Sequence, residues 1–218
     1  MNQNAGGSRP PVQFVAGSPA QGSADIGTGI IVIDDVLPSD EHRKINDLLV
    51  TGPWSYGWRS SNDANAQPFL HRHFGGFTSD LDAQDKRRFT DCSAELMKSA
   101  PLLYSFWQRL QIKAFPNYVL SRCYANGLPY GTDGGVHTDS PVPGDCTAIY
   151  YPHETWHPDW GGETIIFNQD RSDILTAVYP KPNRLFIFPG FVHHAARGVS
   201  RSCPHMRITL MFKTTRKK

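Results

Sequence analysis

The sequence lacks a long hydrophobic run, since no apolar stretch approaches the roughly 18 residues that a membrane-spanning helix needs. Its first residues carry neither the basic region nor the apolar stretch of a secretory signal. A strong basic excess, typical of nucleic-acid binding, is also lacking, because 22 Lys and Arg against 20 Asp and Glu leave a net charge of +2. We therefore expect a cytoplasmic protein with no membrane or nucleic-acid partner.

Cysteine is scarce, with four residues in 218, and no two of them form a CxxC pair. This spacing argues against a zinc knuckle or a redox dithiol. In a reducing cytoplasm, buried free thiols are the simplest expectation.

The chain has the length of one domain. Residues 1–25 are rich in Gly, Ser, Pro, Gln and Asn, which predicts a mobile lead-in that touches the domain near Phe14. Residues 26–218 should form the single domain. Its last segment, 213–218, carries four positive charges, and we expect it to be a solvated end.

Two patterns divide this domain. Residues 38–112 favour a helical layer, because Ile45, Leu48 and Leu49 share one helical face and apolar residues recur at helical spacing up to a break at Pro101. From 116 to 213, short apolar runs separated by Gly- and Pro-rich turns predict an antiparallel β-roll core. The expected fold is therefore mainly β with N-terminal helices, of the jelly-roll type. The expected strands are 29–34, 118–124, 147–151, 164–167, 174–178, 184–188, 191–195 and 207–212.

The most informative pair is His137 and Asp139. Residues two positions apart in an extended strand point to the same side, so the imidazole and the carboxylate would face one point. They would supply two ligands of a 2-His-1-carboxylate triad, which leaves three positions of an octahedral Fe(II) open. Alone, such a tripeptide is weak evidence, because a hydrogen-bonded pair at a strand end has the same pattern.

A third ligand has to come from another strand. His193 and His194 follow a buried apolar run, and adjacent strand residues point to opposite sides, so only one of the two can serve. Arg207 follows His194 by thirteen residues and shares a strand face with Thr209. An inward-pointing Arg needs an anion, since an unpaired buried charge is very costly, and a dicarboxylate ligand would satisfy it.

These residues, in this order, resemble the iron(II)/2-oxoglutarate-dependent oxygenases, and most closely their prolyl-hydroxylase-like branch, which includes small bacterial tailoring enzymes. The resemblance spans 116–213 and rests on His-Thr-Asp at 137–139, Trp-Gly-Gly-Glu at 160–163, Phe-Pro-x4-His at 188–194 and Arg-x-Thr at 207–209. It implies a double-stranded β-helix, with Fe(II) and 2-oxoglutarate as cofactors and O2 as co-substrate.

The resemblance also implies residue roles. His137, Asp139 and the distal His would hold the iron, and the Phe-Pro-x4-His spacing selects His194 over His193. Arg207 would bind the distal carboxylate of 2-oxoglutarate, with Thr209 beside it and Tyr124 near the same cofactor. Relatives commonly place the basic residue closer to the distal His, which makes Arg201 a weaker competitor. Candidate substrate contacts are Arg122, Asn126, Arg59, His73, Tyr151 and Trp156.

A second metal motif, HExxH, occupies 153–157 and is typical of zinc peptidases. Its chemistry needs a helix, so that two His one turn apart can bind zinc. Pro152, Pro158 and the Gly pair at 161–162 disfavour that helix, and we expect a loop. The peptidase is therefore a remote alternative, as is a non-catalytic β-sandwich binding module.

The resulting hypothesis is a dioxygenase that oxidises a C–H bond, most often by hydroxylation, and decarboxylates 2-oxoglutarate to succinate. A small metabolite or natural-product intermediate is the first choice of substrate, because the chain is compact. A prolyl or other protein residue is the alternative. The oligomeric state cannot be read from the sequence.

Overall fold

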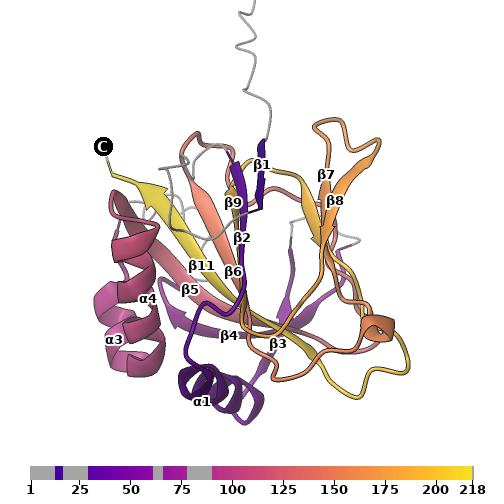
Figure 1. Cartoon of the computed structure of the whole chain (residues 1–218), viewed down its shortest axis with the longest axis horizontal. Helices are drawn as coiled ribbons and strands as arrows, with labels where there is room; N and C mark the ends of the chain where they lie inside the picture. The colour runs from indigo at the N-terminus through magenta and orange to yellow at the C-terminus, as the bar shows by residue number, and fades with distance from the viewer. Residues whose placement is uncertain (1–12, 17–28, 61–65, 78–89, 218) are drawn as a thin grey trace, which may run out of the picture.

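The computed structural model describes residues 13–16, 29–60, 66–77 and 90–217, which form two facing β-sheets with helices on the outer side of the larger one (Figure 1). Within these residues the larger sheet has the strand order β1-β2-β9-β6-β11-β5-β4-β3 and the smaller one β10-β7-β8. All strand pairs are antiparallel except β1 with β2. This mainly β arrangement confirms the expected jelly-roll fold.

The strands of the larger sheet are β1 (Gln13–Ala16), β2 (Gly29–Ile33), β3 (Ser55–Trp58), β4 (Phe69–Gly75), β5 (Tyr118–Leu128), β6 (Cys146–Tyr151), β9 (Arg184–Pro189) and β11 (Arg207–Arg216). Those of the smaller sheet are β7 (Thr164–Phe167), β8 (Ile174–Val178) and β10 (His194–Ala196). The helices are α1 (Ser39–Val50), α3 (Ser93–Ser99), α4 (Pro101–Lys113) and the single 3-10 turn η1 (Pro158–Trp160).

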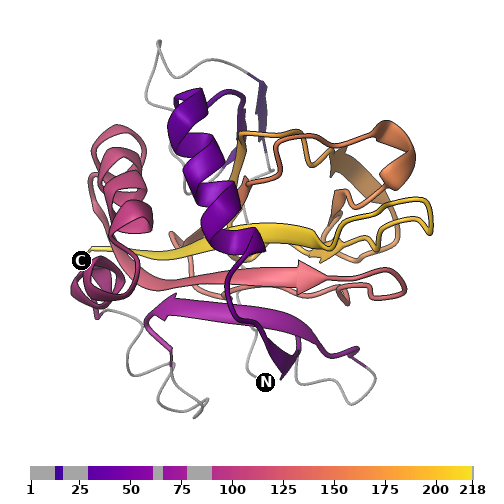
Figure 2. The same ribbon diagram turned by 90° about the horizontal axis from the view of Figure 1, so that it is seen from below.

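The helices cover one face of the larger sheet, as Figures 1 and 2 show for α1, α3 and α4. Helix α4 begins at Pro101, where the missing N–H costs nothing, and this confirms the expected break. Ile45 of α1 and Phe106 of α4 are buried in one core with Leu210 and Phe212 of β11. This core anchors the middle of the sheet, because β11 pairs with both β5 and β6.

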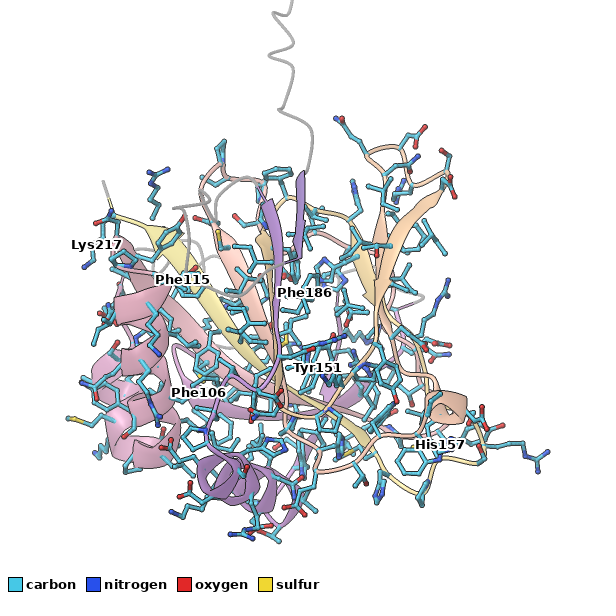
Figure 3. All side chains as sticks on the ribbon, viewed as in Figure 1. Phe106, Phe115, Tyr151, His157, Phe186 and Lys217 are labelled. Atoms are coloured by element: carbon cyan, nitrogen blue, oxygen red, sulfur yellow. The ribbon has the colours of Figure 1, made fainter. Side chains whose placement is uncertain are left out.

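A second core lies between the two sheets. Tyr151 and Phe186 belong to it, together with Ile166 from the smaller sheet, and Figure 3 shows the first two away from the helix-side Phe106 and Phe115. Alternate residues of β11 face this inter-sheet space, because successive side chains of a strand point to opposite faces. The inter-sheet space is therefore where inward-facing polar side chains can form a site.

The structure corrects three expectations. The helical layer at 38–112 is interrupted by β3 and β4, which extend the larger sheet beyond β5. Part of the expected lead-in, 13–16, forms β1 and pairs with β2. The segment expected to be solvated instead continues β11 to Arg216, and its first residue, Lys213, is only 5% exposed, because this strand has neighbours on both sides.

Three other features of the described residues concern the segment 136–139, the cysteines and the helix lengths. Residues 136–139 form no strand of their own and are joined to β10 by an isolated bridge between His137 and His194. The cysteines are free thiols, three of them buried and Cys203 half-buried. Within the described part of the chain, no helix has the length and apolar character needed to cross a membrane.

Candidate metal centre

His137, Asp139 and His194 meet between the sheets at the end of β9. Their potential ligand atoms all lie within 4.8 Å of one another. The two imidazole rings have their centroids 4.3 Å apart, and Asp139 Oδ1 lies 3.4 Å from His137 Nε2. Residues 57 positions apart in the chain thus present three donor atoms to one point, as the sequence analysis predicts.

Backbone hydrogen bonds hold these three residues in place. His137 and His194 exchange both N–H···O bonds, each 3.0 Å long, and the Asp139 N–H donates to the Gly190 carbonyl at 2.8 Å. The loop after β9 therefore positions the carboxylate, while the bridge to β10 positions the first imidazole.

Both imidazole rings are also oriented by their Nδ1 atoms. His137 Nδ1 lies 2.8 Å from the Gly135 carbonyl, and His194 Nδ1 lies 3.0 Å from the Val192 carbonyl. A carbonyl only accepts, so the proton sits on Nδ1 in each ring and the Nε2 lone pair is left for a metal. Burial, more than any nearby charge, lowers the pKa of His194 to about 3, which keeps this ring neutral.

The carboxylate of Asp139 is ionised although its side chain is only 8% exposed. Burial alone would raise its pKa, but Lys213, His194 and His137 together hold that pKa well below its usual value. Two neutral imidazoles and one carboxylate on a compact face are the donor set that suits non-haem Fe(II) with open positions. The residues present therefore fit an iron ion.

A cavity of about 780 Å³ opens beside the triad. All three triad residues line it, and so do Arg207, Thr209 and Thr164 on the inner faces of β11 and β7. The cavity thus joins the candidate metal centre to a buried guanidinium.

Arg207 is 2% exposed, and its hydrogen-bond acceptors are neutral, while burial lowers its pKa and the nearby Glu163 carboxylate raises it. Its Nε donates to the Gly162 carbonyl at 2.5 Å and its Nη2 to the Thr164 hydroxyl at 2.9 Å. The Tyr151 ring lies beside the guanidinium, and the Tyr151 hydroxyl is 2.7 Å from the Thr164 hydroxyl. A buried guanidinium at a cavity wall, hydrogen-bonded to neutral groups, suits an anionic ligand.

Comparisons with known proteins agree with this geometry. Residues 123–213, which carry the triad and Arg207, match the family model of the 2OG-Fe(II) oxygenase superfamily. This segment, and not the whole chain, resembles the 2OG-Fe(II) oxygenase superfamily. With the triad, the match identifies the protein as a 2-oxoglutarate-dependent dioxygenase with Fe(II) and 2-oxoglutarate as its cofactors. No protein of curated function matches it significantly in sequence.

Solved structures share the fold of this oxygenase at low sequence identity. A 2OG-Fe(II) oxygenase-family oxidoreductase from Burkholderia pseudomallei is 15% identical, with a TM-score of 0.59 and coverage of 96% of this chain and 97% of the other. HygX from Streptomyces hygroscopicus, solved with nickel and 2-oxoglutarate, is 10% identical, with a TM-score of 0.57 and coverage of 86% of this chain and 82% of the other. A Trichoplax adhaerens prolyl hydroxylase, solved with a peptide fragment of hypoxia inducible factor, is 17% identical, with a TM-score of 0.55 and coverage of 86% of this chain and 83% of the other.

The structure gives different surroundings to the alternative residues, His194 and His193 for the third ligand and Arg207 and Arg201 for the basic residue. His194 lines the cavity and His193 does not, in agreement with the spacing argument. Arg201 lies in an exposed turn, whereas Arg207 is buried at the cavity wall.

The predicted substrate contacts fall into two groups. Arg59, Arg122 and Asn126 line the cavity, and so does Tyr124, which the resemblance places near 2-oxoglutarate. His73 lies behind this wall, with its ring centroid 5.5 Å from that of Tyr124.

Tyr151 and Trp156, which the sequence analysis names as candidate substrate contacts, do not line the cavity. Tyr151 is fully buried, with its ring beside the Arg207 guanidinium. Trp156 packs on the ring of His153 at 4.7 Å and donates to the Gly161 carbonyl, so it supports the loop before β7.

The HExxH string forms no helix. Residues 153–157 are irregular, and the His153 Nε2 accepts the Ile208 N–H at 3.0 Å, which uses the atom that a zinc ion would need. His157 is exposed and accepts from the Asp159 N–H at the start of η1. The geometry that a zinc peptidase requires is therefore missing at this string.

Sequence reasoning missed Lys213 and Thr147. Both are buried, and both contact Asp139: Thr147 Oγ1 donates to Oδ2 at 2.6 Å, and Lys213 Nζ makes an ion pair with the same oxygen. The alternation along β11 could have found Lys213, because 207, 209, 211 and 213 share one face. Thr147 has no comparable signal, since only the strand pairing brings it opposite Lys213.

Proposed function

We propose that this dioxygenase oxidises a C–H bond, by hydroxylation in the first instance, in a small metabolite or natural-product intermediate. The observation that carries the proposal is one continuous cavity, which links the triad, the buried Arg207 and a wall of aromatic and polar side chains that includes Arg59 and Arg122. Decarboxylation of 2-oxoglutarate to succinate accompanies the reaction in this proposal.

His137, Asp139 and His194 would hold the iron. An iron ion held by these residues would supply the oxidising chemistry. The role of the chain is to keep both Nε2 lone pairs and one carboxylate oxygen aimed at the same point, which the carbonyls at Gly135 and Val192 do through the Nδ1 protons.

Arg207 would bind the distal carboxylate of 2-oxoglutarate. Support comes from its burial, its position on the cavity wall and its hydrogen bonds, which go to the neutral Gly162 carbonyl and Thr164 hydroxyl. Thr209 and Thr164 line the cavity beside it. We assign Tyr151 to this anion site as well, since its hydroxyl bonds Thr164 next to the guanidinium.

The substrate would lie against the wall formed by β3, β4 and β5. Trp58 contacts His71 and His73 there, with ring centroids 5.4 and 5.0 Å apart. In the described part of the chain, His71 Nδ1, both nitrogens of His73 and Asn126 Oδ1 are buried without a hydrogen-bond partner. Buried polar atoms of this kind normally have partners, so a ligand with its own donors and acceptors fits this wall.

Size favours a small substrate at this wall, where the charged side chains that line the cavity are Arg59 and Arg122. The cavity of about 780 Å³ has to hold 2-oxoglutarate as well as the substrate. Burial lowers the pKa of His73 to about 4, and it lowers that of His71 as well, so that both rings are neutral near pH 7. The neutral imidazole of His71, which lines the cavity, offers one donor and one acceptor, the pattern that recognises hydroxyl or amide groups.

The test starts from anaerobic protein with Fe(II) and 2-oxoglutarate, which should give a weak visible charge-transfer band. His137→Ala should abolish the band, and His157→Ala should retain it, because His157 is exposed and belongs to the HExxH string. The absence of the band in the unaltered protein would refute the metal centre.

The substrate class is tested next, by succinate release in air with a panel of small metabolites and, separately, with proline-containing peptides and proteins. Stimulation by small molecules supports the proposal. A mass gain of one oxygen on a peptide or protein, without such stimulation, would replace it by protein-residue hydroxylation. The cytoplasmic location stays a prediction.

A further inference from the structure

The two oxygens of Asp139 have different surroundings. Oδ1 faces His137 Nε2 at 3.4 Å. Oδ2 accepts from the Thr147 hydroxyl at 2.6 Å, is paired with the Lys213 ammonium, and lies 3.6 Å from His194 Nε2. Each carboxylate oxygen has about two lone-pair sites, so Thr147 and Lys213 between them satisfy Oδ2.

Lys213 and Thr147 form a small polar pair on neighbouring strands. They are directly opposite each other in the β11–β6 register, and Lys213 Nζ donates to Thr147 Oγ1 at 3.1 Å. The lysine side chain is 7% exposed, and its other neighbour is the Tyr124 ring, 6.0 Å from Nζ. The pair is therefore held by the sheet itself.

A lysine in this position is costly for the fold. Its ammonium loses its hydration, and an apolar residue of similar size would fill the same space at lower cost. Its charge also opposes that of any cation bound by the triad, because it lies on the same carboxylate. A role in stability alone does not explain it.

We propose that Lys213 is a positioning residue for the metal centre: with Thr147 it occupies Oδ2 of Asp139 and so restricts the carboxylate to binding the metal through one oxygen. The proposal rests on the proposed function of the triad. The single-oxygen mode keeps three coordination positions open, where a two-oxygen mode would leave two.

The same pair sets the charge of the site. The charges of Asp139 and Lys213 oppose each other in an ion pair, so the carboxylate offers a divalent ion less net negative charge than it would alone. The negative charge of 2-oxoglutarate then offsets that of the ion. Lys213 thus makes metal binding weak alone and stronger with 2-oxoglutarate, a coupling that works equally in both directions.

The experiment measures the affinity of metal-free, full-length protein for Mn(II), with and without 2-oxoglutarate, from the electron paramagnetic resonance signal of free Mn(II). Lys213→Met removes the charge and keeps the length of the side chain. In the absence of 2-oxoglutarate, this variant should bind Mn(II) about tenfold more tightly. Even at the dielectric constant of water, the repulsion between one positive charge and a nearby divalent ion is of this order. The enhancement by 2-oxoglutarate should shrink in the same variant.

Two controls separate this effect from others. Lys44→Met removes an exposed lysine of α1, 62% exposed, and should leave Mn(II) binding unchanged. Lys213→Arg retains the charge and should keep the weak binding and its enhancement by 2-oxoglutarate. If Lys213→Met does not fold by circular dichroism, Lys213→Gln replaces it, with the same expected direction.

Weaker or unchanged Mn(II) binding in the neutral variant would overturn the proposal, because the lysine would then only build the site or be irrelevant to it. Failure of the unaltered protein to bind Mn(II) would refute the metal centre itself. The two failures are distinguishable, since the first leaves the unaltered protein with a metal and the second does not.

Discussion

Replacement of Arg207 by Met tests the anion site most directly. The guanidinium is buried at the cavity wall with the neutral partners Gly162 and Thr164, so its charge should stabilise bound 2-oxoglutarate. Two parallel charge-assisted hydrogen bonds contribute about 3 to 5 kcal/mol together. At about 1.4 kcal/mol for each factor of ten, Arg207→Met should raise the Kd of 2-oxoglutarate by roughly a hundredfold to a few thousandfold.

The measurement is calorimetric titration of 2-oxoglutarate into Mn(II)-loaded protein, where no oxygen chemistry interferes. Mn(II) binding without 2-oxoglutarate should survive, because Arg207 does not belong to the triad. Arg201→Met is the matched control, since it removes the same charge from an exposed turn and should leave the Kd unchanged. A rise of less than about tenfold in the Arg207 variant would contradict the argument, since it would amount to one ordinary hydrogen bond or less.

Three further predictions concern single side chains. His194→Ala should abolish Mn(II) binding and His193→Ala should not, because only His194 joins the triad; equal losses would refute the assignment. Tyr151→Phe should weaken 2-oxoglutarate by about 1 kcal/mol, roughly fivefold, and leave Mn(II) affinity unchanged; an unaltered Kd would remove Tyr151 from the anion site. Burial, His205 and Arg207 lower the pKa of His153 to about 3. Because that is below the unfolded value of 6.5, its contribution to stability is present above pH 6.5 and is lost as the pH falls toward 3, with a slope of about 1.4 kcal/mol per pH unit. His153→Gln should flatten this slope in urea unfolding at pH 7 and 5, and an unchanged slope would contradict the assignment.

The strands after residue 116 could be predicted from the sequence because their apolar runs are separated by Gly- and Pro-rich turns. Thr164–Phe167 and Ile174–Val178 agree with the predicted bounds at both ends. The strands β3 and β4 were not predicted, since their residues mix aromatic, charged and imidazole side chains. One face of β4 lies toward the cavity and the other toward α1, where Arg72 donates to the Leu48 carbonyl, so neither face shows a simple apolar pattern.

The candidate site was predictable to the extent that it is local. His137 and Asp139 are two residues apart, and Arg207 and Thr209 share one strand face, so short-range periodicity finds both pairs. The surroundings of Asp139 were not predictable, because Thr147 and Lys213 reach it from two different strands. The position of Lys213 in a basic C-terminal segment favoured a solvated end, and the two-sided pairing of β11 overrode that pattern.

The sequence by itself determined the class of fold and the candidate residues His137, Asp139, His194 and Arg207, because periodicity and turn residues act over a few positions and the motif types limit the chemistry. Tertiary structure alone decided that Tyr151 lies beside Arg207 and Thr164, and that Lys213 is paired with Asp139. These contacts depend on the register between strands that are far apart in the chain. That register follows from the packing of the two sheets and their helices as a whole.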